Sequence, residues 1–119
     1  MKPGHSGIKR LIKATGFSIQ GLKAAFKHES AIRQELFMIL ILGPVALLSN
    51  TTAVEKSLLL MTIFLILIIE LINSAIEAVV DRIGPELHEL SGRAKDIGSA
   101  AVLIALILAI LVWCIIFFL

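Results

Sequence analysis

Two kinds of hydrophobic pattern divide the chain, a spaced one near the N-terminus and continuous ones after it. Between Ile8 and Phe26, apolar residues recur at helical spacing on one face, and lysines lie on or near the opposite face. This pattern predicts an amphipathic helix over residues 8–27, lying in a membrane interface with its lysines toward anionic headgroups. An amphipathic helix packed on protein would share the pattern, but a membrane span follows directly and favours the interface.

Three continuous apolar segments follow the amphipathic one. The first purely apolar run, residues 36–48, is shorter than the roughly 20 residues that cross a bilayer, so we expect this span to begin earlier. The pattern predicts membrane spans over residues 30–48, 56–80 and 97–119, with a polar loop over residues 82–96.

The composition supports an integral membrane protein with a single all-α domain. Hydrophobic residues make up 58% of the 119 residues and charged residues 17%, against about a quarter in a typical soluble domain. The single cysteine, Cys114, can form no intrachain disulfide. The net charge of +2 and the lack of a basic stripe with interleaved aromatic residues argue against a nucleic-acid partner.

Lysine and arginine residues set the expected orientation. All eleven except Lys56 lie in residues 1–33 or in the loop over residues 82–96. Because positively charged residues stay on the cytoplasmic side, we expect the N-terminus and this loop in the cytoplasm and the C-terminus outside.

An acidic stripe occupies the end of the second predicted span. After an uncharged run over residues 57–69, Glu70, Asn73, Glu77 and Asp81 fall within about 80° of a helix surface. Ionisable side chains inside a membrane are costly and face protein or water, so the stripe is a candidate functional site. Structural interpretations stay open. Glu70 could form an ion pair with Arg10 or Arg33, and Glu77 and Asp81 could be ordinary interfacial acids.

The depth of these acids suits phosphoryl transfer to a lipid. Helix rise places Glu70 about 10 Å deeper than Glu77, on the side of the membrane where ATP is expected. Phosphoryl transfer needs a metal on the phosphates, cations beside them and a base at the attacking oxygen. Mg²⁺ takes one or two carboxylates, which Glu29 and Glu77 could supply, and Lys95 or Arg93 could supply a cation. Glu70 is then placed as the general base.

Two other features of the sequence bear on this interpretation. The sequence contains neither a Walker A loop nor the motifs of protein kinases, so a kinase here would have an unrelated design. An alternative from another class is a membrane subunit without enzymatic activity, in which Glu70 serves an ion or proton pathway.

Two long segments resemble the signature of the prokaryotic integral-membrane diacylglycerol kinases: residues 70–82, ELINSAIEAVVDR, and residues 89–102, ELSGRAKDIGSAAV. Shorter segments fit the same family, namely Lys13-Ala14, Gly21-Leu22, Ala24-Ala25 and Arg33-Gln34-Glu35. The resemblance implies a homotrimer of three-span subunits with a surface helix, in the bacterial inner (cytoplasmic) membrane, with active sites between neighbouring subunits. It implies transfer of the ATP γ-phosphate to the hydroxyl of 1,2-diacylglycerol, giving phosphatidic acid and ADP. Undecaprenol kinases share the architecture, but Gly92-Arg93 and Gly98-Ser99-Ala100 look more like the diacylglycerol branch.

The resemblance also implies roles for individual residues. Glu70 is the expected proton acceptor with Asn73 supporting it, and Glu29 and Glu77 are expected to hold Mg²⁺. The residues expected to bind ATP are Arg10, Phe17, Glu29, Glu77, Glu86, His88, Lys95 and Asp96. The residues expected along the lipid path are Arg10, Ala31, Ile32, Arg33, Gln34, Glu35, Lys56, Glu70, Ser99 and Trp113. Trp113 also suits an aromatic-belt anchor, and His88 a solvated loop residue.

A few positions depart from the family pattern. Phe17 and Leu87 stand where relatives usually have tyrosine, so stacking on adenine is retained while a hydroxyl is lost. These departures leave nucleotide preference open and do not touch the expected catalytic and metal-binding residues.

Overall fold

The computed structural model describes residues 6–83 and 89–119, which fold into helices joined by short turns. In chain order these are α1 (Gly7–His28), α2 (Ser30–Leu48), α3 (Ala53–Ile83) and α4 (Glu89–Phe118). The described residues contain no strand, and α2, α3 and α4 are each long and apolar enough to cross a membrane. The prediction of an all-α protein with three long apolar helices is therefore confirmed.

The prediction of a polar loop over residues 82–96 is largely wrong. Helix α3 continues to Ile83, and α4 already begins at Glu89, so only residues 84–88 fall outside the described helices. The hydrophobic pattern does not predict helix at the end of α3 and in the first turns of α4, because many side chains there are charged or polar. Charged side chains can nevertheless stabilise a helix. Arg93 lies one turn after Glu89 and forms a 3.4 Å ion pair with it, at a spacing that favours the helix.

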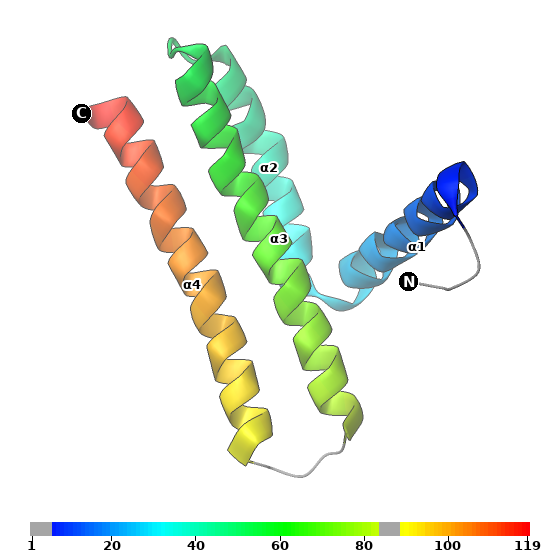
Figure 1. Ribbon diagram of the computed structural model, residues 1–119. Coiled ribbons are helices and arrows are strands. Elements are labelled where there is room, and N and C mark those ends of the chain that lie inside the picture. Colours follow the sequence, from blue (N-terminus) through cyan, green and yellow to red (C-terminus); the bar gives the residue numbers. More distant parts are fainter. Residues whose placement is uncertain (1–5, 84–88) are drawn as a thin grey trace.

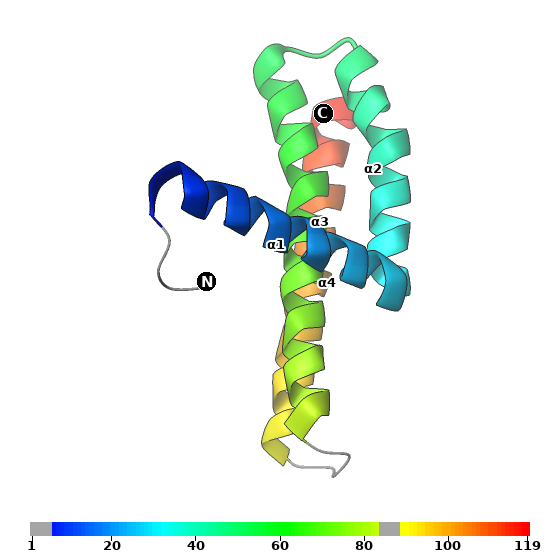
Figure 2. The ribbon, with the colours of Figure 1, turned by 90° about the vertical axis from the view of Figure 1, so that its right-hand side faces the viewer.

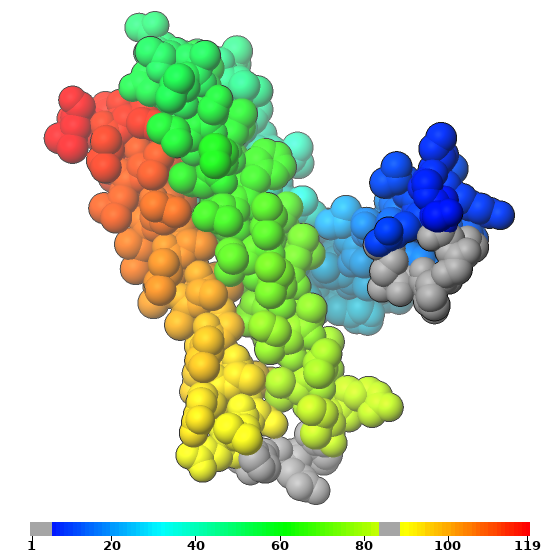
Figure 3. All heavy atoms as spheres, in the orientation of Figure 1, coloured from blue at the N-terminus to red at the C-terminus, as the bar shows by residue number. Residues whose placement is uncertain are grey.

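Helix α3 is the centre of the molecule. It packs against α4 along one side and against α2 along another, and α1 meets the start of α2 at a steep angle (Figures 1 and 2). In the space-filling view, α1 projects away from the body formed by the three long helices (Figure 3). The first half of α1 is therefore set apart from the three candidate membrane spans.

The corner between α1 and α2 is built around Glu29. Its extended backbone (φ −121°, ψ 112°) ends one helix and starts the next. Arg33 stabilises the corner by donating from Nη1 to the carbonyl oxygens of Phe26 (2.6 Å) and Lys27 (3.2 Å). These carbonyls belong to the last turn of α1, which lacks partners within its own helix, so Arg33 acts as a C-terminal cap.

The opposite end of the bundle is closed by a capping box. Thr52 and Glu55 bond reciprocally, Glu55 N–H to Thr52 Oγ1 at 3.1 Å and Thr52 N–H to Glu55 Oε1 at 2.8 Å. Lys56 donates from Nζ to the carbonyl oxygens of Ser49 (2.9 Å) and Thr51 (2.7 Å). The turn that reverses the chain between α2 and α3 is thereby fixed by side chains of α3 itself.

The buried core of a single chain is narrow. Its fully buried large side chains are Ile32, Leu59 and Ile66, and small Ala105 and Ala109 bring α4 close to α3. Most other large apolar side chains of the three long helices are exposed. Such a surface suits a lipid environment or contact with further copies of the chain.

Candidate active site

The acidic stripe of α3 faces the corner between α1 and α2. Glu70 is buried in the helix bundle, with 7% of its surface exposed. Its carboxylate interacts electrostatically with those of Glu77 on the same helix and Glu29 at the corner, and the carboxylate of Glu35 on α2 interacts with Glu70. The structure therefore brings together acids from three segments, including all three that the sequence assigned to the base and the metal.

Asn73 connects to one of these acids by a direct hydrogen bond. Its Nδ2 donates to Glu77 Oε1 at 2.8 Å, one turn further along α3. The family resemblance implies that this amide supports Glu70, whereas in the structure it bonds Glu77, one of the two carboxylates expected to bind metal. Asn73 Oδ1 is buried without a hydrogen-bond partner among the described residues.

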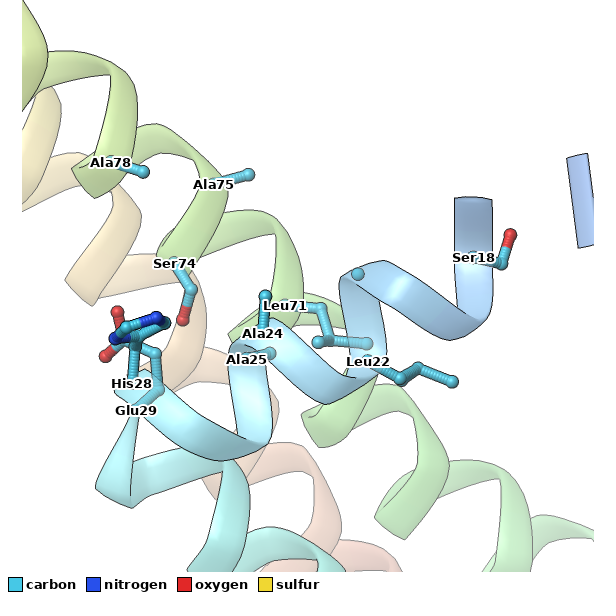
Figure 4. A pocket seen from close by; sticks show the side chains of 11 residues that line it. Ser18, Leu22, Ala24, Ala25, His28, Glu29, Leu71, Ser74, Ala75 and Ala78 are labelled. Carbon is cyan, nitrogen blue, oxygen red and sulfur yellow. The ribbon is translucent and has the colours of Figure 1, made fainter. Parts of the chain in front are cut away.

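A pocket of about 660 Å³ opens between the second half of α1 and the middle of α3 (Figure 4). Its walls are mostly apolar and small, with a polar end formed by His28 and Glu29 beside Ser74 (Figure 4). The lining residues are Ser18, Gly21, Leu22, Ala24, Ala25, His28, Glu29, Leu71, Ser74, Ala75 and Ala78. Glu29 thus connects the acidic cluster to a cavity with room for part of a ligand.

The donor set fits Mg²⁺ bound together with phosphate. Carboxylate oxygens are hard ligands, and Mg²⁺ commonly takes one or two of them and completes its octahedron with water and phosphate oxygens. Within residues 6–83 and 89–119, no group of three or more His, Cys, Asp or Glu side chains is arranged to hold a metal ion. Glu29 and Glu77, the two carboxylates expected to bind metal, would hold the ion, and the Asn73 amide would orient Glu77, as outer hydrogen bonds commonly orient metal ligands.

Lys95 brings a cation from α4 to the end of the acidic stripe. Its Nζ lies 2.7 Å from Asp81 Oδ1 and interacts electrostatically with Glu77. Both partners of the ion pair remain substantially exposed, so the ammonium is accessible to an incoming phosphate. Arg93, the other candidate cation, instead pairs with Glu89 of its own helix.

Other predicted site residues have contacts within the chain. Arg33 and Lys56 cap backbone carbonyls at the two turns, as described above. Trp113 Nε1 donates to Thr62 Oγ1 on α3 at 2.9 Å, and the indole lies 5.7 Å from the Phe117 ring. Among the described residues of one chain, neither Arg10 nor Arg33 forms an ion pair with Glu70.

The remaining predicted residues are spread more widely. Ile32 is fully buried, Ala31 is half-buried, and the exposed ones are Arg10, Phe17, Gln34, Asp96 and Ser99. Glu86, Leu87 and His88 lie outside the described residues. Arg10 lies near the start of α1, at the end of this helix that projects away from the three long helices (Figure 1).

Sequence reasoning missed several contacts of the site. Thr62 as the acceptor for Trp113, Asp81 as the partner of Lys95 and Ser74 at the pocket wall gave no separate signal. The sequence identifies Asp81 as the last member of the acidic stripe. The helical period predicts which face of α3 carries Asp81, but it does not predict which residue of the neighbouring helix pairs with it.

Comparison with known proteins places these features in a family. A family model described as prokaryotic diacylglycerol kinase matches residues 16–117. The diacylglycerol kinase of Escherichia coli (strain K12) is 52% identical over 115 residues, which cover 97% of this chain and 94% of that protein. The diacylglycerol kinases of Haemophilus influenzae (51% over 108 residues; 91% and 92% covered) and Pseudomonas aeruginosa (46% over 110 residues; 92% and 89% covered) are similar as well. The chain belongs to the prokaryotic diacylglycerol kinase family.

Proposed function

We infer that this chain is an ATP-dependent lipid kinase that phosphorylates the free hydroxyl of 1,2-diacylglycerol, giving phosphatidic acid and ADP. The observation that carries this inference is the buried Glu70 beside Glu29 and Glu77, in a chain whose family match spans all three acids. A carboxylate inside a candidate membrane span is costly to insert, so it is expected to serve a reaction or a pathway. Phosphoryl transfer to the hydroxyl of a membrane lipid needs a base at this depth.

The acids divide the work by depth. Glu70 accepts the proton of the lipid hydroxyl as its oxygen attacks the γ-phosphorus, while the bond from this phosphorus to the bridging oxygen breaks and ADP leaves with that oxygen. Glu29 and Glu77 hold Mg²⁺, which neutralises charge on the nucleotide phosphates when bound. Lys95 exchanges its contact with Asp81 for a phosphate oxygen, because its ammonium is exposed and already near Glu77.

The pocket between α1 and α3 accommodates part of a substrate at the polar end formed by His28 and Glu29. The expected ATP residues Arg10, Phe17, Glu86, His88 and Asp96 and the lipid-path residues Ala31, Ile32, Gln34, Glu35 and Ser99 surround this centre in the assembled enzyme. A homotrimer with active sites between neighbouring subunits is supported by the wide exposed apolar surface and by the projecting α1. Location in a bacterial inner membrane, with the N-terminus in the cytoplasm, is supported by the distribution of lysine and arginine.

Lipid phosphorylation by the purified protein tests this function. Protein in lipid micelles is supplied with [γ-³²P]ATP, Mg²⁺ and either diacylglycerol or undecaprenol, and the labelled lipids are separated. We expect labelled phosphatidic acid from wild type and at least about a hundredfold less from Glu70→Gln, since a general base contributes about 10²–10⁴-fold. Labelling of undecaprenol alone would reassign the lipid substrate, and folded protein that labels neither alcohol would contradict the kinase assignment.

A further inference from the structure

Gly98 is buried at the contact between α4 and α3, where its missing side chain makes room for Asn73. A Cβ built on Gly98 would overlap Asn73 Oδ1 and lie 3.3 Å from Asn73 Cγ. The other interior helical glycines that the structure describes behave differently, because a Cβ at Gly16, Gly21, Gly43 or Gly92 would meet no packing neighbour within 4 Å. The close approach is therefore particular to Gly98 and to the amide of the candidate active site.

The Asn73 amide has two unlike ends, and each has a distinct environment. The NH₂ end donates to Glu77 Oε1 at 2.8 Å, while the buried oxygen end faces Gly98 without a hydrogen-bond partner. Turning the amide over would place its oxygen against the Glu77 carboxylate, and two acceptors cannot bond. Glu77 therefore fixes the orientation of the amide, and the oxygen can occupy its buried position only because residue 98 lacks a Cβ.

We propose that Gly98 is a positioning residue of the phosphoryl-transfer site, acting through Asn73 to hold the Glu77 carboxylate in the orientation that binds the metal–nucleotide complex. This proposal rests on the proposed function of Glu77. A side chain at residue 98 displaces the Asn73 amide, Nδ2 leaves Glu77 Oε1, and the carboxylate becomes free to rotate. Loss of such an outer hydrogen bond commonly costs about 10–100-fold in metal affinity or activity.

The test compares Gly98→Ala with Gly92→Ala in the full-length protein in lipid micelles. Gly92 is a matched control because it lies on the same helix and its Cβ would meet no packing neighbour. We expect Gly98→Ala to raise the Mg²⁺ concentration for half-maximal diacylglycerol phosphorylation about tenfold or more. Gly92→Ala should leave it unchanged.

A second readout does not depend on turnover. Mg²⁺ with a non-hydrolysable ATP analogue should raise the thermal unfolding temperature of wild type and of Gly92→Ala, because ligands that bind the folded state stabilise it. At the same ligand concentrations, the shift should be much smaller for Gly98→Ala. Loss of the shift identifies a binding defect, which a merely less stable but correctly arranged helix pair would not show.

Combination with Asn73→Ala separates the proposed route from a general packing defect. Asn73→Ala removes the atoms that a Cβ at residue 98 would meet, so adding Gly98→Ala to it should change activity less than about twofold. The proposal is overturned if Gly98→Ala matches wild type in Mg²⁺ dependence and thermal shift, or if the two substitutions multiply in the double variant. Failure of the proposed function itself would look different, because wild type would then phosphorylate no lipid alcohol.

Discussion

Glu70 and Glu77 lie on one face of α3, but their surroundings differ in ways that assign them different tasks. Glu70 is buried beside other carboxylates, whereas Glu77 is half-buried and held by Asn73. We expect Glu70→Gln to lower kcat by at least about a hundredfold with little change in the Mg²⁺ requirement. Glu77→Gln should instead raise the Mg²⁺ concentration needed for half-maximal rate by about tenfold or more.

The measurement is the rate of lipid phosphorylation across a Mg²⁺ titration at saturating diacylglycerol. Glutamine keeps the size of each side chain, so a thermal unfolding curve close to that of wild type serves as the folding control. If both variants lost kcat alone, or both changed the Mg²⁺ requirement alike, the division between base and metal ligand would be wrong.

Lys95 and Arg93 are two cations within one turn of α4, and they form ion pairs in different directions. Lys95 reaches across to Asp81 on α3, whereas Arg93 pairs with Glu89 on its own helix. We expect Lys95→Gln to raise the KM for Mg-ATP about tenfold or more, since a charge-assisted bond to phosphate is worth about 1.5–3 kcal/mol. Initial rates against ATP concentration measure this effect.

Arg93→Gln is the matched control, because it removes the same charge from the same region of the helix. Arg93 pairs with Glu89 of its own helix, and this exposed ion pair contributes only about 0–1 kcal/mol. Because we expect Arg93 to make no contact with phosphate, its loss should change the KM for Mg-ATP less than about threefold. A larger effect from Arg93→Gln than from Lys95→Gln would show that the nucleotide uses the other cation.

At the scale of elements, the first half of α3 and the second half of α4 are joined by the hydrogen bond from Trp113 to Thr62. Thr62 is buried and also bonds the Leu59 carbonyl at 2.7 Å, so its hydroxyl both donates and accepts. Polar contacts between membrane helices contribute about 0.6 kcal/mol on average. We expect a coupling of about this size between Thr62→Val and Trp113→Phe in a double-mutant cycle.

Reversible unfolding of the four proteins in mixed micelles measures the coupling. The same variants also test the expected lipid contact of Trp113. If the indole serves mainly to join the helices, Trp113→Phe should leave the KM for diacylglycerol within about twofold of wild type, as Thr62→Val does. A rise confined to Trp113→Phe would support a contact with the lipid substrate.

The sequence predicted elements better than it predicted their contacts. The apolar runs identify three long helices because membrane spans require about 20 apolar residues each. The apolar runs do not identify the first turns of α4, where residues 89–96 are mostly polar yet helical. The helical period places Asn73 beside both Glu70 and Glu77. The hydrogen bond to Glu77 and the packing of Gly98 from α4 together determine how its amide lies. The contact between Thr62 and Trp113 joins residues far apart in the chain, which no local pattern reveals.

At the scale of the whole molecule, α1 is the element that a single chain leaves without a full set of partners. It projects from the three-helix body, and its first turns, which carry Arg10, lie at the projecting end (Figures 1 and 3). Arg10 can therefore serve a nucleotide in a neighbouring subunit of the proposed homotrimer. Glu70 and Glu77, by contrast, interact on the same helix, so we expect them to belong to the same site.

Mixing subunits that carry different impairing substitutions distinguishes these two relations. Arg10→Ala and Glu77→Gln proteins are unfolded together, refolded and assayed for diacylglycerol phosphorylation. If each site takes Arg10 from one subunit and Glu77 from its neighbour in a ring, random assembly of equal amounts leaves about a quarter of the sites intact. We therefore expect activity to recover well above that of either variant alone. The control mixture of Glu70→Gln with Glu77→Gln should not recover, because every site takes both acids from one chain and each chain carries one defect. Recovery in the control mixture would show that α3 residues of different subunits share a site, and no recovery in the first mixture would place Arg10 and Glu77 of one site within a single chain.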